Sequence, residues 1–266
     1  FINWRLNLGN SIPSSSAIPI FSIKKSTREI RDSISRISTG LKVLGGNDAA
    51  SHSMATNLAA HAASFKSASS NNQHGIDLLA FVEGALLELT ELTTRLRELG
   101  LAHDLATNDT ADIAGLNAEA VSVSDTIDSI VSSLTFNGIN VLGTSSKTFN
   151  VGINDAGSTQ SIQTTIGIAA TSITGANGVE NSSDTTLGEI TQSLGAVAGS
   201  YRSLQGYQNV AESSAASLLE AASNLQSTDY AIETAQLTKN SIIQNYAMAM
   251  VAQVNNEELK KLKILA

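Results

Sequence analysis

The chain has 266 residues, enough for one or two domains, and carries a formal net charge of −8 at pH 7. This charge argues against a nucleic-acid partner, which needs a basic surface, and the absence of Cys excludes disulfides and thiolate chemistry. No apolar run approaches the roughly 18 residues of a membrane span, so we expect no membrane partner. The first residues also lack the continuous apolar core of a secretory signal.

The apolar residues are mostly small or aliphatic. They make up 42% of the chain, whereas aromatic residues contribute only 4%. Such a composition suits long helices that lie close together, because ordinary globular cores rely more on bulky rings. The two prolines are Pro13 and Pro19, so no later position must break a helix.

The first half of the chain follows a helical heptad pattern, in which apolar residues alternate steps of three and four. A first helix should carry one apolar stripe, and Gly45–Asn47 should interrupt it. A helix of small residues follows, and a turn with a helix cap is expected near 106–112. The three apolar stripes comprise Ile30, Ile34, Ile37 and Leu41; Leu79, Val82, Leu86, Leu89, Thr93 and Leu96; and Ile113, Leu116, Ala120, Val123, Ile127, Ile130 and Leu134.

The middle of the chain, roughly 136–175, is rich in Gly, Asn, Ser and Thr. Its apolar residues alternate at Phe149, Val151 and Ile153, and again from Ile162 to Ile168, which predicts strands separated by a turn. We therefore expect a β-hairpin or small meander there, followed by a loop over Gly175–Asp184.

Helical heptads return after the loop and continue to the last segment. The stripe comprises Leu187, Ile190, Leu194, Val197, Tyr201, Leu204, Gln208, Ala211, Ala215, Leu218, Ala222 and Leu225. A final helix is expected over Ser227–Asn256, with Ile243, Tyr246, Met250 and Val254 on one side. Heptads in both arms imply that the arms pack together. The predicted fold class is therefore mainly α: an elongated coiled-coil rod with paired N- and C-terminal arms and a small β-hairpin region in the middle.

The final helix is apolar nearly all round, and leaving it in water would be costly at roughly 25 cal/mol per Å² of apolar surface. Three outcomes are open: disorder until a partner arrives, packing on copies of itself, or binding to a membrane. The small residues Ala247, Ala249 and Ala252 allow close helix approach. They favour packing between protein helices.

Four segments in order carry a family resemblance. They are "SISRISTGLKV" at Ser33–Val43, "NNQHGIDLLAFVEGALLELTELTTRLRELGL" at Asn71–Leu101, "LTFNGINVL" at Leu134–Leu142, and "DYAIETAQLTKNSIIQNYAMAMVAQVNN" at Asp229–Asn256. Together they resemble bacterial flagellin, the subunit of the flagellar filament, in a short form lacking outer domains. The chain departs from the usual family pattern at "NDAAS", Asn47–Ser51, and at "QHG", Gln73–Gly75.

The resemblance implies a domain plan. Residues 1–40 and 227–266 would form an inner coiled-coil domain that lines the filament core. Residues 41–135, 136–185 and 186–226 would supply the N-terminal helices, the hairpin with its loop, and the C-terminal helix of a rod domain. The implied subunit contacts are Ile30, Ile34, Ile37, Leu41, Asp229, Tyr230, Leu237, Ile243, Tyr246, Met250 and Val254.

The resemblance also implies a setting and partners. The chain would leave the cell unfolded through the flagellar type III export apparatus and assemble at the tip of an extracellular filament. Its terminal segments would be largely disordered as a monomer and fold on assembly. The implied partners are other flagellin subunits, the cap and junction proteins, and an export chaperone.

A second implied surface lies on "TRLREL". In flagellins that Toll-like receptor 5 recognises, positions equivalent to Arg95, Leu99 and Glu119 form part of the recognised patch. Leu99 falls off the heptad stripe, which favours an outward position. The same surface is also expected to contact the next subunit, so filament packing explains these residues equally well.

The sequence supplies no pattern for catalysis, a metal or a cofactor. His52 and His61 are too far apart for a helical i, i+4 metal pair, and no nucleophile-elbow context supports a Ser-His-Asp set. We therefore expect a structural protein without catalytic residues, metal or cofactor. The alternatives are a hook–filament junction protein and a secreted helical effector that acts on membranes or host cells.

Overall fold

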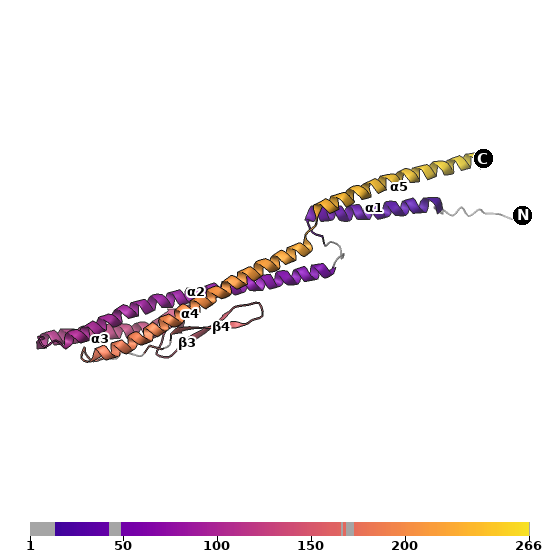
Figure 1. Cartoon of the computed structure of the whole chain (residues 1–266). Coiled ribbons are helices and arrows are strands. Elements are labelled where there is room, and N and C mark those ends of the chain that lie inside the picture. The colour runs from indigo at the N-terminus through magenta and orange to yellow at the C-terminus, as the bar shows by residue number, and fades with distance from the viewer. Residues whose placement is uncertain (1–13, 43–48, 166, 169–172, 266) are drawn as a thin grey trace. The chain divides into compact units, whose positions relative to one another are not determined.

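The computed structural model describes residues 14–42, 49–165, 167–168 and 173–265, and this part of the chain is mainly helical (Figure 1). The described helices are α1 (Ser14–Thr39), α2 (Ala49–His103), α3 (Thr110–Ser133), α4 (Val179–Gln226) and α5 (Tyr230–Leu265). The predicted mainly α fold class is confirmed. The predicted break at Gly45–Asn47 lies outside the described residues.

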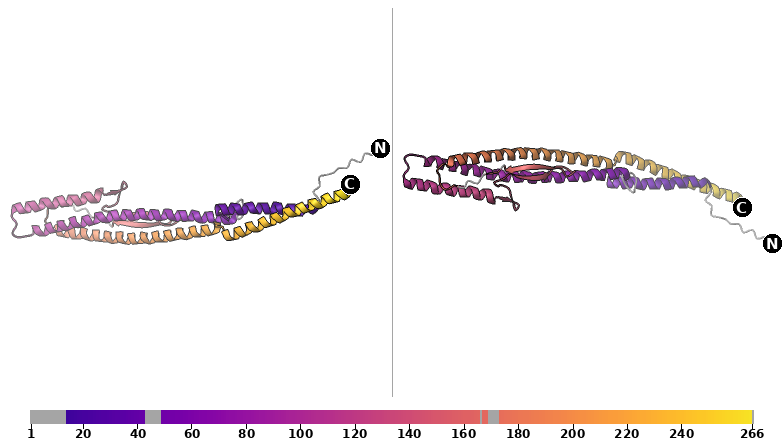
Figure 2. Two further views of the ribbon diagram at one scale, coloured as in Figure 1. Left: turned by 90° about the horizontal axis from the view of Figure 1, so that it is seen from above. Right: turned by 90° about the horizontal axis from the view of Figure 1, so that it is seen from below.

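The chain divides into two compact units. Unit 1 comprises Phe1–Ala59 and Glu220–Ala266, and unit 2 comprises Ala60–Leu219. In unit 1, α1 and α5 run antiparallel side by side (Figures 1 and 2). Unit 2 contains α3, the strands, and most of α2 and α4.

In unit 2, α2 has a different neighbour on each of two sides. The Arg97 guanidinium lies 2.6 Å from Asp184 of α4, and a Cβ added to Gly100 would lie 3.1 Å from the backbone nitrogen of Glu180. Arg95 instead reaches Glu119 of α3 at 2.7 Å. Because residues three or four apart share a helix face, α2 buries one stripe against α4 and a second against α3.

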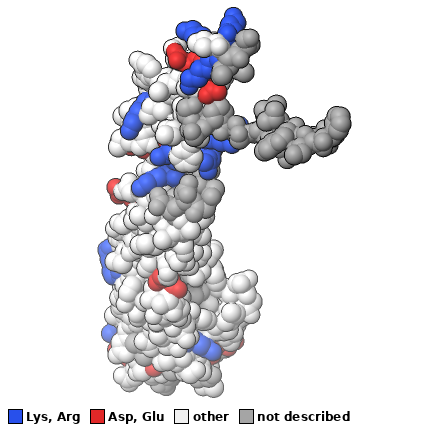
Figure 3. Space-filling view, turned by 90° about the vertical axis from the view of Figure 1, so that its right-hand side faces the viewer, with Lys and Arg blue, Asp and Glu red and all other residues white. Residues whose placement is uncertain are grey.

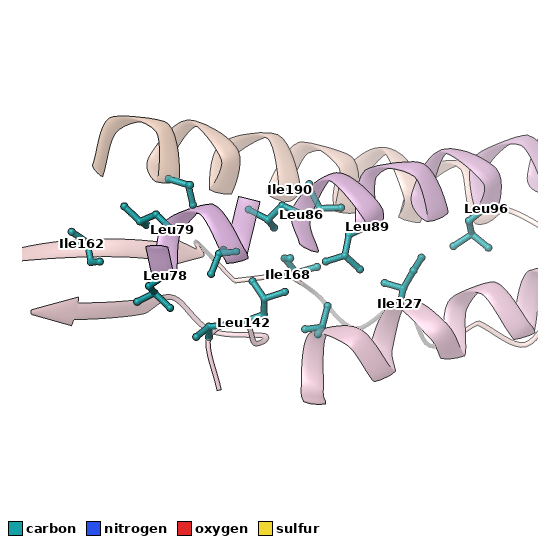
Figure 4. Packing of buried hydrophobic residues seen from close by; sticks show 14 of the residues in the cluster. Leu78, Leu79, Leu86, Leu89, Leu96, Ile127, Leu142, Ile162, Ile168 and Ile190 are labelled. Carbon is teal, nitrogen blue, oxygen red and sulfur yellow. The ribbon is translucent and has the colours of Figure 1, made fainter. Parts of the chain in front are cut away.

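The predicted heptad stripes of unit 2 meet in one hydrophobic core (Figure 4). Leu86 and Leu89 of α2 lie beside Ile190 of α4 and Ile127 of α3, and all four side chains are fully buried. Thr93, the polar member of the α2 stripe, is buried too, and its hydroxyl donates to the Leu89 carbonyl at 2.7 Å. That bond satisfies the hydroxyl, so the stripe tolerates it.

The predicted helix cap before α3 is confirmed. Asp109 is the N-cap, and its carboxylate accepts hydrogen bonds from the backbone N–H groups of Ala111 and Asp112, each at 2.8 Å. The Asp112 carboxylate in turn accepts the Asp109 N–H at 3.3 Å. This reciprocal arrangement satisfies N–H groups that a helix start otherwise leaves unpaired.

The middle segment forms two antiparallel hairpins. They comprise β1 (Thr135–Phe136) with β2 (Ile139–Asn140), and β3 (Lys147–Gly152) with β4 (Thr159–Thr165). Between β1 and β2, Asn137 and Gly138 have φ values of 50° and 78°, as a type I′ turn requires. The Asn-Gly pair is a strong hairpin signal. A search for alternating apolar residues alone does not detect it.

The predicted second strand is too long. β4 ends at Thr165, and Gly167 has a φ of 109°, a conformation that favours Gly and turns the chain. Ile168 is therefore outside the strand; its N–H donates to the Gly143 carbonyl at 3.0 Å and its side chain is buried. The alternation reaches Ile168 because that residue faces the core after the turn.

Candidate assembly surface on the terminal helices

The two terminal helices face each other through a seam of mainly small and polar residues. We use seam for the line of residues on each helix that faces the other. On α1 it includes Ser26 and Ser33, which are 3% and 1% exposed, with partly buried Ile residues between and beside them. On α5 the buried members are Glu233, Asn240 and Ala247, spaced by seven residues as a coiled coil requires.

The same two helices carry their large apolar side chains on the outside. Tyr246 is 71% exposed and Met250 is 60% exposed, although both belong to a helix of a folded pair. We name this outward set the apolar face: Ile18, Phe21, Ile34, Tyr230, Ile232, Ile242, Ile243, Tyr246, Met248, Met250, Leu259 and Ile264. A soluble helix pair normally has the reverse arrangement, and large exposed apolar patches mark interaction sites.

The sequence-predicted contact residues fall on both sides of the pair. Ile30, Ile37, Leu237 and Val254 are partly buried between the helices. The exposed members are Ile34, Leu41, Asp229, Tyr230, Ile243, Tyr246 and Met250. The structure therefore separates one predicted set into an inner and an outer group.

The predicted single stripe from Ile30 to Leu41 is wrong. α1 ends at Thr39, Gly40 adopts a φ of 70°, and Leu41 forms an antiparallel bridge with Ser227 instead. Ile34 points outward, because the residue that faces α5 in that turn is Ser33. A prediction based on apolar residues alone omits the buried serines, and the predicted stripe is therefore displaced from the residues that face α5.

The start of α5 is also three residues later than predicted, at Tyr230 instead of Ser227. Asp229 caps the helix: its carboxylate accepts from the N–H groups of Ala231 at 2.8 Å and Ile232 at 3.3 Å. The backbone just before it is tied to the end of α1, since the Thr228 N–H donates to the Gly40 carbonyl at 3.0 Å. Gly at position 40 is favoured by its φ of 70°, and a Cβ there would also lie 2.9 Å from the Tyr230 hydroxyl oxygen.

One ion pair crosses the seam close to this junction. The Arg36 Nε and Nη2 donate to the two carboxylate oxygens of Glu233 at 2.8 and 3.0 Å, and the side chains are only 18% and 11% exposed. The bond from Arg36 lowers the pKa of the Glu233 carboxyl below its usual range and raises the pKa of the guanidinium. Ser33 is the second hydrogen-bonding partner that lowers the Glu233 pKa, so both charges are matched within the seam.

Comparison with known proteins agrees with these terminal motifs. The family model described as the bacterial flagellin N-terminal helical region matches residues 15–147. The chain belongs to the bacterial flagellin family. It is 27% identical to flagellin FlaB1 of Treponema pallidum (strain Nichols), over 89% of this chain and 92% of that protein. It is 29% identical to flagellin of Halalkalibacterium halodurans, over 86% of this chain and 89% of that protein, and 28% identical to flagellin of Bacillus subtilis (strain 168), over 86% and 90%.

Members of this family are structural subunits of the flagellar filament, and this flagellin is one of short form. The matched relatives are covered almost end to end, so the similarity includes both terminal helices and the short middle segment. The candidate functional site of this filament-forming protein is therefore a surface for assembly, the apolar face on α1 and α5, and not a catalytic site.

Acid is expected to weaken the α1–α5 pair of this flagellin through Glu233. A carboxyl whose pKa is lowered in the folded state stabilises that state above the ordinary Glu value of about 4.3, and the stabilisation is lost as the pH falls through the lowered pKa. Glu233→Gln should remove this contribution at neutral pH, at a cost of roughly 1.5–3 kcal/mol for a charged hydrogen-bonded partner. Thermal unfolding by circular dichroism between pH 3 and pH 7 measures the difference.

The matched control for that experiment is Glu29→Gln. Glu29 pairs with Lys25 at 3.8 Å on the exposed side of α1, and such surface pairs contribute little. This variant should keep the wild-type pH profile, whereas Glu233→Gln should flatten it between pH 5 and pH 3. An unchanged profile in Glu233→Gln would contradict the role given to the pair.

Charge is divided unequally between the two units. By sequence, unit 1 holds 11 Lys and Arg against 8 Asp and Glu, a net charge of +3, and unit 2 holds 5 against 16, a net charge of −11. Figure 3 shows Lys and Arg residues in blue and Asp and Glu residues in red on one face of the molecule. The net negative charge of the chain therefore lies in unit 2, and the small net charge of unit 1, which carries the apolar face, limits like-charge repulsion between copies there.

The patch expected from receptor-recognised flagellins is only partly assembled. Arg95 and Glu119 lie together on the exposed surface of unit 2, and Arg95 also reaches Glu98 at 3.2 Å. Leu99, expected to point outward, is 1% exposed and belongs to the core. That expectation is wrong because Leu99 lies four residues after Arg95, on the stripe of α2 that packs against α3.

The described part of unit 2 also has several open grooves. One of about 740 Å³ lies beside α3 and is lined by residues that include Asp125, Asp128 and Lys147, and one of about 490 Å³ is lined mainly by apolar residues that include Leu78, Phe136 and Phe149. Across the described ranges, no group of three or more His, Cys, Asp or Glu side chains is placed to hold a metal ion. Within those ranges, too, none of the helices combines the length and the apolar character needed to cross a bilayer.

Proposed function

We propose that this flagellin assembles into an extracellular flagellar filament by burying the apolar face of α1 and α5 against the same helices of neighbouring copies. The observation that carries the proposal is the reversed polarity of the pair. Ser26, Ser33 and Asn240 are buried inside it, while Tyr246 and Met250 are left in water.

The sequence of α5 supports burial over most of its length. Between Thr234 and Asn256 it holds a single charged residue, Lys239. A helix that stayed at a water-exposed surface would normally carry charges along its outer side. Removing the apolar face from water supplies a driving force of about 25 cal/mol for each Å², and the small residues Ala249 and Ala252 permit close approach between helices.

Electron microscopy of the purified protein tests the proposal directly. The full chain, incubated with a precipitant or with filament seeds, should form helical filaments. A variant lacking residues 227–266 should form none, because it has no α5 to present. Circular dichroism should show that the truncated protein is still soluble and helical. In that case, the absence of filaments results from loss of the contact and not from loss of folding.

The other outcomes distinguish the alternatives. A full chain that never polymerises alone but binds the ends of preformed filaments would indicate a hook–filament junction protein. A monomer that binds lipid vesicles and forms no filament would indicate a membrane-active effector. Filaments from the truncated chain would overturn the assignment of the contact to α5.

Further partners are proposed on the same surfaces. The apolar face needs cover before assembly, which fits an export chaperone, and the filament ends would present it to cap and junction proteins. Contact with Toll-like receptor 5 is proposed through Arg95 and Glu119 alone, since these side chains remain exposed. We further propose that the chain acts purely as a structural protein and not as an enzyme.

A further inference from the structure

We propose that the Arg36–Glu233 pair sets the register of α1 on α5, and thereby determines which side chains the terminal helices present to neighbouring subunits. This inference rests on the proposed assembly through those helices. It assigns the two residues a positioning role, because they act on the apolar face through the alignment of the helices and do not themselves form part of it.

The pair is suited to this role because the rest of the seam discriminates poorly between registers. The buried seam residues Ser26 and Ser33 of α1 are seven residues apart, and so are Asn240 and Ala247 of α5, so a slip of one heptad would again bring small or uncharged polar residues together. A single polar residue in a coiled-coil seam is a known means of fixing register. Among the described residues, the side-chain bonds that cross the seam include the bidentate Arg36–Glu233 contact, with Ser33 as a second partner of Glu233, and a hydrogen bond from Gln244 to Thr27 at 3.0 Å.

Each slip of one heptad separates the charges. In one direction, Glu233 would move from Arg36 to the turn of α1 that holds Glu29, which places two carboxylates together. In the other direction, Arg36 would face Asn240, while Glu233 would lie beyond Thr39, where α1 ends. Both alternatives leave a partly buried charge without its partner, which is strongly unfavourable.

A change of register would also alter the assembly surface. Sliding α5 along α1 by seven residues would carry Tyr246 and Met250 along the pair by about 10 Å, at 1.5 Å per residue. The outward residues of α1, such as Phe21 and Ile34, would then have different neighbours. Subunits in mixed registers could not present one repeating surface, which a regular helical polymer requires.

The register can be measured in the soluble full-length chain, because the sequence contains no native Cys. Three reporter chains carry Thr27→Cys together with Gln244→Cys, Leu237→Cys or Val251→Cys. The first pair reports the native register, and the other two report the slips of one heptad. Each reporter chain is crosslinked with a short bifunctional thiol reagent. The crosslinking is measured in the otherwise native sequence, in the Arg36→Glu and Glu233→Arg single variants, and in the double variant.

The native background should crosslink 27 to 244 in preference to either slipped pair. Each single reversal should lower that preference by at least about tenfold, equivalent to roughly 1.4 kcal/mol. The double reversal should restore most of it, because the ion pair is re-formed with its charges exchanged. Lys25→Glu, which changes the charge of α1 equally but at an exposed pair, should leave the preference unchanged.

Loss of preference in the single variants without recovery in the double variant would overturn the positioning role and indicate general destabilisation. An unchanged preference in the single variants would also overturn it, since the backbone bonds at Gly40 and Leu41 would then suffice. Crosslinking is read before assembly, so these outcomes do not depend on filament formation. A monomer with the expected register but no filaments would contradict the proposed function and leave this inference standing.

Discussion

Replacing Tyr246 and Met250 together with Asp will abolish filament formation and leave the monomer folded. Both side chains stand in water in the isolated chain, at 71% and 60% exposure, so the substitutions break no contact inside the helix pair. In a polymer that buries the apolar face, the same positions would place carboxylates in an apolar contact without partners. Burying an unpaired charge is strongly unfavourable.

The expected size of the effect follows from the apolar area alone. Burying one large apolar side chain contributes about 1.5–3 kcal/mol, and two contribute roughly twice that if they act independently. Since about 1.4 kcal/mol corresponds to a tenfold change, the critical concentration for assembly should rise at least about a hundredfold. Sedimentation of polymer at a series of protein concentrations measures this quantity.

The matched control keeps the apolar character. Tyr246→Phe with Met250→Leu should polymerise close to the wild-type concentration, because shape and apolar area are largely retained. Circular dichroism of both double variants should show the monomer unchanged. Normal assembly of the Asp variant would mean that these positions face solvent in the filament, and the apolar face would then need another explanation.

The sequence predicts unit 2 better than unit 1, for a physical reason. In unit 2 the residues that face a neighbour are large and apolar, such as Leu86, Ile127 and Ile190. Their spacing therefore reports the packing directly. The heptad pattern therefore predicts both the helices and the core that they form.

In unit 1 the same method misassigns residues because polar and small side chains form the inner seam. Ser33 faces α5, yet its apolar neighbour Ile34 is the residue that a hydrophobic pattern selects. If assembly buries the outer side of this helix pair, as proposed, the pair does not need an apolar seam to be stable in the polymer. Its apolar pattern would then reflect neighbours from other subunits, whereas a single sequence shows only that the helix is apolar on several sides.

The partner of Glu233 could not be predicted from the sequence either. Arg36 and Glu233 are 197 residues apart, and neither lies in a motif that names a partner. The available signal was Glu233 itself, a charged residue at a heptad position of α5, which between Thr234 and Asn256 contains only Lys239 as a further charged residue. Identifying the partner would have required the register of α1 on α5. The apolar pattern could not supply that register, because it selects Ile34 and not Ser33 as the residue that faces α5.

Leu99→Ala should destabilise unit 2 and should not act as a simple surface change. Leu99 is 1% exposed within the hydrophobic core, and removing a buried Leu side chain typically costs roughly 2–5 kcal/mol, depending on how far the cavity collapses. Leu101→Ala, two residues further along α2 and 52% exposed, is the matched control and should change stability by less than about 0.5 kcal/mol. Urea unfolding of the monomer, followed by circular dichroism, compares the two.

The result bears on how receptor or assembly data at Leu99 should be interpreted. If Leu99→Ala lowers stability as expected, a loss of signalling or polymerisation in that variant follows from weakened packing of α2 on α3. Direct contact would then be tested at Arg95 and Glu119, which the structure leaves at the surface. If Leu99→Ala instead matches Leu101→Ala in stability, Leu99 is outside the core in solution, and the second buried stripe of α2 is contradicted.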